Sequence, residues 1–152
     1  MRIAFDLDGT VVPMSAGQFP ALPSRWPWRA VFRERLRDDT ITLMRELRGQ
    51  GHEVWIYTSS LRPIGYIRLW FLSCRVSLSG VINAETARKA APSAGHRASK
   101  FPPAFGIDLL VDDSAGVELE GRQFGFSVVR VDPGDHRWAS KVREAVRHAT
   151  GK

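Results

Sequence analysis

The chain has 152 residues, the length of one ordinary domain, so any lid over a binding site has to be a short insert. Hydrophobic residues make up 43% and charged residues 25% of it, which excludes extended disorder and collagen-like repeats. The formal net charge is +6, and the segment at 60–100 accounts for the whole excess. This segment is expected to form either a solvated basic face or a contact surface for an anion.

The N-terminal part of the chain predicts a strand, a flap and two helices. Residues 11–28 hold four of the nine prolines and show no periodic apolar pattern, so they predict a structured loop or small hairpin. The spacing of Ile41, Met44 and Leu47 predicts an apolar stripe on a helix. The expected elements are a strand at 3–7, the flap at about 11–28, a short helix at 30–36 and a helix from 39 to about 49–51.

The remaining segments alternate between strand and helix patterns. The expected elements are strands at 54–57, 81–83, 109–111 and 127–131, and helices at 63–72 and 138–149. Residues 86–99, rich in Ala, Ser and Arg, predict an exposed and mobile connection. Such alternation is typical of a parallel sheet covered on both faces. We therefore expect one α/β domain over residues 1–152, with a three-layer α/β/α, Rossmann-like arrangement and a mainly parallel five-stranded sheet.

Polar side chains follow three of the predicted strands directly. They are Asp6 and Asp8 after the first strand, Thr58 and Ser59 after the second, and Asp112 and Asp113 after the fourth. Ligands bind at the carboxyl ends of the strands in an open parallel sheet, and residues i and i+2 of an extended segment point the same way. Asp6 and Asp8 are therefore expected to face one site. Gathered carboxylates repel one another, and a hard divalent cation, Mg²⁺ above all, would resolve this repulsion.

The same segments resemble three motifs of the haloacid dehalogenase-like (HAD) superfamily of phosphohydrolases. Residues 6–10 read DLDGT, which is similar to the first motif, DxDGT after an apolar strand. Thr58 stands where the second motif has a Thr or Ser, and Asp112-Asp113 is similar to the acidic pair of the fourth motif. The order and spacing agree over nearly the whole chain. The resemblance implies a HAD-like fold, hydrolysis of phosphate esters and a Mg²⁺ cofactor.

The resemblance also implies roles for individual residues. Asp6 would attack phosphorus and form an aspartyl-phosphate, and Asp8 would act as general acid and then as general base. Thr58 would donate a hydrogen bond to a phosphoryl oxygen. The substrate contacts expected beside it are Gly9, Thr10 and Ser59. The expected metal ligands are Asp6, the backbone carbonyl of Asp8, Asp113 and, directly or through another group, Asp112.

A basic residue, usually lysine, forms the third motif of the family and has no sharp sequence pattern. Lys100 is our candidate because it lies just before the segment that leads into the fourth strand. Lys89 and Arg88 are the alternatives. Arg62 follows the second strand closely, so it is expected either to reach a substrate anion or to lie on the surface at the start of a helix.

The sequence does not determine which phosphate ester is the substrate. Asp8 argues against dehalogenation, because a halide leaving group needs no proton. Neither the flap nor the segment at 74–100 is long enough for a large cap domain, and minimally capped members of the family act on large substrates or borrow a lid in a homo-oligomer. A nucleotide, a polynucleotide phosphate end and a small phosphate ester are all possible substrates. Trp26 and Trp28 either pack within the flap, the commoner role, or stack on a base.

Two non-enzymatic functions are the alternatives. One is a regulatory module that accepts phosphate as response-regulator receivers do, and the other is a nucleic-acid-binding module without catalysis. The second Asp of DxDGT favours repeated turnover over a lasting phosphoryl mark.

The sequence also predicts where the protein is located. The single cysteine, Cys74, excludes an internal disulfide. The longest apolar run, at 69–72, is too short to span a bilayer, and the chain opens on a strand pattern rather than a secretory signal. We expect a cytoplasmic protein with no membrane partner.

Overall fold

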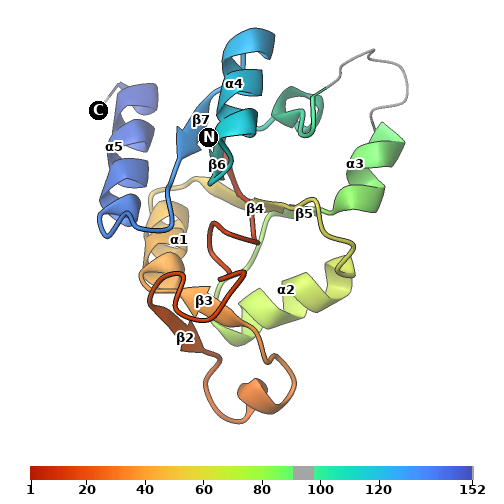
Figure 1. Cartoon of the computed structure of the whole chain (residues 1–152), viewed down its shortest axis with the longest axis vertical. Coiled ribbons are helices and arrows are strands. Elements are labelled where there is room, and N and C mark those ends of the chain that lie inside the picture. The colour runs from red at the N-terminus through yellow and green to blue at the C-terminus, as the bar shows by residue number, and fades with distance from the viewer. Residues whose placement is uncertain (91–97, 152) are drawn as a thin grey trace.

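A computed structural model of the chain describes residues 1–90 and 98–151. Its centre is a five-stranded parallel sheet in the order β5-β4-β1-β6-β7 (Figure 1). The strands are β1 (Arg2–Phe5), β4 (Glu53–Tyr57), β5 (Gly80–Ile82), β6 (Leu109–Asp112) and β7 (Val128–Arg130). Phe5 of β1 pairs with Ile56 of β4 and with Val111 of β6, so these three strands end at one edge of the sheet. The expected α/β fold is confirmed.

Helices cover both faces of the sheet, and the alternation of side chains along β1 shows why. Ile3 and Phe5 pack into a large hydrophobic cluster with α1, α2 and α5, whereas Ala4 belongs to a second cluster with α4 on the other face. The helices are α1 (Thr40–Gly49), α2 (Ile64–Ser73), α3 (Ala84–Ala90), α4 (Ala115–Phe124) and α5 (Trp138–Thr150), with the short 3-10 helices η1 (Trp28–Ala30) and η2 (Pro102–Phe105). Among the described residues, no helix combines the length and hydropathy needed to cross a membrane.

Two helices lie where the sequence predicted none. α3 occupies the start of the expected mobile connection at 86–99, of which residues 91–97 lie outside the described part of the chain. α4 shows no regular apolar stripe, because its buried residues are Val117 and Gly121. Gly121 packs so closely on the next segment that a Cβ there would lie 2.7 Å from the carbonyl oxygen of Phe126. Close packing through a glycine leaves no hydrophobic periodicity to read.

The insert between β1 and α1 is longer than expected. The helix predicted at 30–36 is wrong, since residues 35–37 form β3 (Arg35–Arg37), antiparallel to β2 (Ala21–Pro23). Buried Arg37 anchors this hairpin by donating hydrogen bonds to the carbonyl oxygens of Thr10 at 3.3 Å and Asp135 at 2.9 Å. Residues 24–34, which connect β2 to β3 and are called the arm below, extend from the body beside α2 (Figure 1). The flap expected at 11–28 therefore continues to Arg37.

Candidate active site

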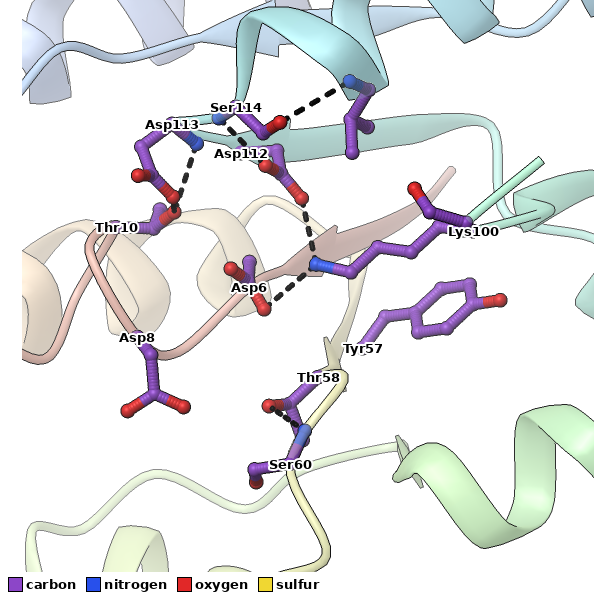
Figure 2. Close-up of polar contacts among 12 residues, drawn as sticks. Asp6, Asp8, Thr10, Tyr57, Thr58, Ser60, Lys100, Asp112, Asp113 and Ser114 are labelled. Atoms are coloured by element: carbon purple, nitrogen blue, oxygen red, sulfur yellow. Dashed lines mark hydrogen bonds and ion pairs between the residues drawn. The ribbon is translucent and has the colours of Figure 1, made fainter.

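Two buried carboxylates and one buried ammonium group meet at the carboxyl edge of the sheet. Nζ of Lys100 lies 2.7 Å from Oδ1 of Asp6, the residue after β1, and 2.7 Å from Oδ2 of Asp112, the last residue of β6 (Figure 2). None of the three residues is more than 7% exposed. The backbone N–H of Ser114 donates to Oδ1 of Asp112 at 2.9 Å. Both oxygens of Asp112 are therefore held in place.

The electrostatics of this cluster favour an additional cation. Burial raises the pKa of Asp6 to about 6, opposed by Lys100 and reinforced by Asp112. Burial alone would lower the pKa of Lys100, but the two carboxylates outweigh it and the net shift is upward. Lys100 therefore stays charged at neutral pH, and the carboxylates around it outnumber it. A cation bound beside them would offset the remaining repulsion.

Asp113 completes a group of three carboxylates that could hold a metal ion. Asp6, Asp112 and Asp113 each offer an oxygen, and these atoms all lie within 4.8 Å of one another. The Thr10 hydroxyl donates to Oδ1 of Asp113 at 3.0 Å and accepts from its backbone N–H at 3.0 Å. At Gly9, with a φ of +84°, a Cβ would lie 2.5 Å from Oδ2 of Asp113. Only glycine fits there, and the oxygen donors suit a hard divalent cation.

The geometry favours Lys100 over Lys89 as the basic residue of the site. The Lys89 side chain is 70% exposed and pairs with Glu85, one turn away on α3. Nζ of Lys100 lies 5.9 Å from the ring centroid of Tyr57, and the hydroxyl of Tyr57 accepts a hydrogen bond from the backbone N–H of Phe101 at 3.0 Å. Tyr57 thus fixes the chain next to Lys100 and packs against its ammonium group.

Thr58 and Ser59 follow β4 at the same edge of the sheet. Thr58 is buried, and its Oγ1 accepts a hydrogen bond from the backbone N–H of Ser60 at 3.1 Å (Figure 2). A hydroxyl that accepts such a bond still has its own proton to donate to a ligand. Ser59 is exposed, and both residues line a cavity of about 300 Å³ together with Arg88.

The Asp8 carboxylate points away from Asp6 and pairs with Arg62. Nη1 and Nη2 of Arg62 donate to the two carboxylate oxygens of Asp8 at 2.7 and 2.8 Å. The expectation that Asp6 and Asp8 face the same way is wrong, because the chain turns sharply after Leu7. The carbonyl of Leu7 accepts the backbone N–H groups of the three residues at 10–12. As a metal ligand, Asp8 is left with its backbone carbonyl alone.

Arg62 also joins the carboxyl edge of the sheet to the arm. Its Nε donates to Oε1 of Glu34, near the end of the arm, at 3.0 Å, and the Tyr66 hydroxyl donates to Oε2 of Glu34 at 3.2 Å. The hydrogen bonds that Arg62 donates to the Asp8 carboxylate raise the pKa of Arg62 above its ordinary value. The Arg62 side chain is 22% exposed, so it is neither a free surface group nor an unpaired anion receptor.

Two features of the site could not be read from the sequence. Thr10, expected to contact substrate, is fully buried and orients Asp113 instead. Glu34 was not among the candidates, and its one sequence signal is that it is the only acidic residue among four arginines at 25–35. Both roles depend on residues distant in the chain, so no local pattern marks them.

Comparison with known proteins places the fold but gives no close relative. No profile of a known protein family matches the sequence, and no curated protein sequence matches it either. The structure is similar to a predicted HAD-like hydrolase from Porphyromonas gingivalis, with a TM-score of 0.54, 14% identity and coverage of 96% of this chain and 97% of that one. It is also similar to the HAD domain of the effector protein Lem4 from Legionella pneumophila, with a TM-score of 0.54, 13% identity and coverage of 95% and 93%.

A third structural neighbour is larger than this protein. It is a chain of the Pnkp1/Rnl/Hen1 complex, with a TM-score of 0.58 and 15% identity. The match covers 88% of this chain but only 46% of that chain. The protein therefore has the HAD-like hydrolase fold, and at these identities the likeness concerns the fold alone.

Proposed function

We propose that the protein is a Mg²⁺-dependent phosphatase that hydrolyses phosphate monoesters through an aspartyl-phosphate on Asp6. The observation that carries this proposal is the buried cluster in which Lys100 lies 2.7 Å from both Asp6 and Asp112. A carboxylate attacks a phosphate dianion only where fixed positive charge offsets their repulsion, and Lys100 supplies such a charge. The HAD-like fold, in which this cluster lies at the carboxyl edge of the sheet, supports a hydrolase.

Asp6, Asp8 and Thr58 divide the chemistry between them. Asp6 forms a bond to phosphorus while the ester oxygen departs with the electrons of the broken P–O bond, and Asp8 gives that oxygen a proton. Asp8 then takes a proton from water, whose oxygen attacks phosphorus and releases Asp6 as a carboxylate. The buried Thr58 hydroxyl donates a hydrogen bond to a phosphoryl oxygen in both steps.

Arg62 is a positioning residue in this scheme. Its two hydrogen bonds hold the Asp8 carboxylate in one orientation. A phosphate ester that enters beside Asp8 would compete for the guanidinium group of Arg62. Substrate binding would thereby release Asp8 for proton transfer.

The residues of the site fit Mg²⁺. Asp6, Asp112 and Asp113 are the side-chain ligands we propose, with the backbone carbonyl of Asp8 beside them. When bound, Mg²⁺ would neutralise phosphate charge and orient the phosphoryl group toward Asp6. The hydrogen bonds from Thr10 keep Asp113 oriented for this role.

Phosphate release from an aryl phosphate tests the proposal, with Mg²⁺ and with a chelator. We expect Mg²⁺-dependent turnover in the wild type and its loss in both Asp6→Asn and Asp8→Asn, with melting curves that still show a folded protein. Wild-type activity in either variant would contradict the assigned roles. Arg122→Gln on α4, whose side chain is 71% exposed, is the matched control and should keep full activity.

The substrate class requires a panel of phosphate esters. One structural neighbour belongs to the Pnkp1/Rnl/Hen1 RNA repair complex, and this supports including phosphorylated polynucleotide ends beside nucleotides and small sugar phosphates. A receiver-like module would become phosphorylated once per chain and would release no phosphate catalytically. Counting the phosphate released per protein molecule separates the two functions.

A further inference from the structure

The arm exposes aromatic side chains on an ordered segment. Trp26 is 76% exposed and Trp28 is 48% exposed. Of the two alternatives for these residues, packing within the flap and stacking on a base, the first does not hold for Trp26. The arm is nevertheless built on local hydrogen bonds, including those from the backbone N–H groups of Val31 and Phe32 to the carbonyl of Trp28. Phe32 is buried and packs edge-on against Tyr66 of α2, which anchors the arm to the body.

Four arginines lie close to these tryptophans in the sequence. They are Arg25, Arg29 and Arg33 of the arm and Arg35, the first residue of β3, and all are exposed. Within the described residues, none of the four has an ion-pair partner, and the nearby Glu34 is held by Arg62. A guanidinium group stays charged at any physiological pH. The arm therefore presents fixed and uncompensated positive charge interleaved with exposed aromatic rings.

This surface is continuous with the catalytic edge. Trp26, Arg29, Arg33 and Arg35 line a hollow of about 430 Å³ on the arm. Arg35 also lines a second hollow, of about 380 Å³, together with Asp8 and Arg62. In the proposed function Asp8 protonates the leaving group, so the leaving group has to lie in the second hollow and can extend from there along the arm.

We propose that the arm binds single-stranded nucleic acid and that the substrate is a phosphate at the end of such a strand. The proposal rests on the proposed function for its catalytic part. Arginines bind successive backbone phosphates, and exposed tryptophans stack on bases whatever their sequence. Arg25 and Arg29 flank Trp26 and Trp28 in the sequence, so groups that can bind phosphate lie next to rings that can stack on bases.

The charge of the arm argues against its use as a self-association surface. A symmetric dimer formed through the arm would place the same arginines opposite one another, and like charges repel. Anionic phospholipid is the other polyanion that a surface of tryptophan and arginine could meet. The continuity of the arm with Asp8 favours a polyanion that is itself a phosphate-ester substrate.

Binding of a short single-stranded oligonucleotide with a terminal phosphate tests the inference, in an Asp6→Asn background that does not consume it. We expect Trp26→Ala to weaken binding about 5- to 150-fold, the range found for single base-stacking residues. Arg29→Gln with Arg33→Gln should reduce the slope of log affinity against log salt by about 1.4, since each lost phosphate contact removes about 0.7. Arg137→Gln with Arg147→Gln, both exposed and at the two ends of α5, is the matched control and should change neither.

Kinetics in the wild-type background complete the test. The arm variants should raise the KM for the phosphorylated oligonucleotide and leave turnover of the aryl phosphate unchanged. Equal binding and equal KM in arm and control variants would overturn the inference, as would arm-dependent binding to anionic phospholipid vesicles without oligonucleotide binding. If no phosphate ester is hydrolysed, the proposed function fails, and arm-dependent oligonucleotide binding would still support the binding part alone.

Discussion

The carboxylate cluster and the arm handle charge in opposite ways. In the cluster, Lys100 is 4% exposed and lies 2.7 Å from each of two carboxylates, so its charge is neutralised by ion pairs inside the protein. In the arm, the arginines are exposed and form no ion pair within the described chain. Removing a buried partner leaves an uncompensated charge in a poorly solvated site, whereas water solvates an exposed guanidinium group already. The cluster is therefore coupled to the stability of the fold, and the arm is available to a ligand.

The positive charge of the segment at 60–100 illustrates the same contrast. Lys100 and Arg62 lie in or near the site and are neutralised by acids, and Lys89 pairs with Glu85 on α3. Part of the positive charge of this segment is therefore neutralised by ion pairs within the protein. Arg68, Arg75 and Arg88 of this segment stay exposed, and the arm adds a second exposed cationic surface, which the net charge of the chain does not reveal.

Loss of Lys100 should have the largest effect. Lys100→Met leaves Asp6 and Asp112 buried without a counter-charge, and breaking such a pair costs about 3–5 kcal/mol of unfolding free energy. We expect phosphatase activity to fall by about 10³-fold or more, because the nucleophile loses its adjacent positive charge. Lys89→Met, on exposed α3, should leave both quantities close to wild type. Comparable losses in the two variants, measured by phosphate release and urea unfolding, would contradict the assignment.

Thr10→Val should have the next largest effect. The substitution removes the hydroxyl that donates to Asp113 and accepts from its backbone N–H, while it keeps the volume of the side chain. Loss of a hydrogen bond that orients a metal ligand typically lowers the affinity for the metal by about 10- to 100-fold. Titration of Mg²⁺ by calorimetry measures the change, and Thr42→Val on the exposed side of α1 is its control. An unchanged Mg²⁺ affinity would remove Asp113 from the ligand set.

Asp6→Asn should stabilise the metal-free protein in a pH-dependent way. The folded pKa of Asp6, about 6, lies above the ordinary value of 3.8, so the folded state prefers the protonated form and loses stability as the pH rises through about 6. Asparagine carries no charge to desolvate. In the presence of a chelator, the variant should melt higher than wild type above pH 6, by about 2–4 °C for each kcal/mol relieved.

This advantage should disappear below about pH 4, where Asp6 is protonated in both the folded and the unfolded state. Melting curves at pH 4 and pH 7 check the prediction. A variant that is less stable than wild type at pH 7 would mean that the ion pair with Lys100 outweighs the cost of burying Asp6.

The smallest effect should come from the arm. Arg29→Gln with Arg33→Gln removes two exposed charges without a partner among the described residues, so the melting temperature should stay within about 1 °C of wild type. A larger fall would show that the arm contributes to the fold, and the contrast between the two regions would then fail. The same two substitutions serve in the binding test, where their effect is expected to be large.

Several features of the site followed from the sequence because local chemistry encodes them. The apolar run before Asp6 predicts a strand, and Gly9 accommodates the turn that brings Thr10 back to Asp113. The acidic pair at 112–113 likewise follows directly on a buried strand. Parallel strands end at one edge of the sheet, so these residues meet without any further information.

By itself the sequence determined which polar residues follow β1, β4 and β6. It also indicated a HAD-like fold, in which these residues lie at one edge of the sheet. Only the tertiary structure decided which charged side chains form ion pairs with one another. Asp8 meets Arg62 across 54 residues, and Arg62 meets Glu34 across 28. It also decided that residues 35–37 form β3 where a helix was expected at 30–36, and that the arginines of the arm are exposed. The physical reason is that periodicity reports local conformation, whereas salt bridges and exposure depend on how distant segments pack.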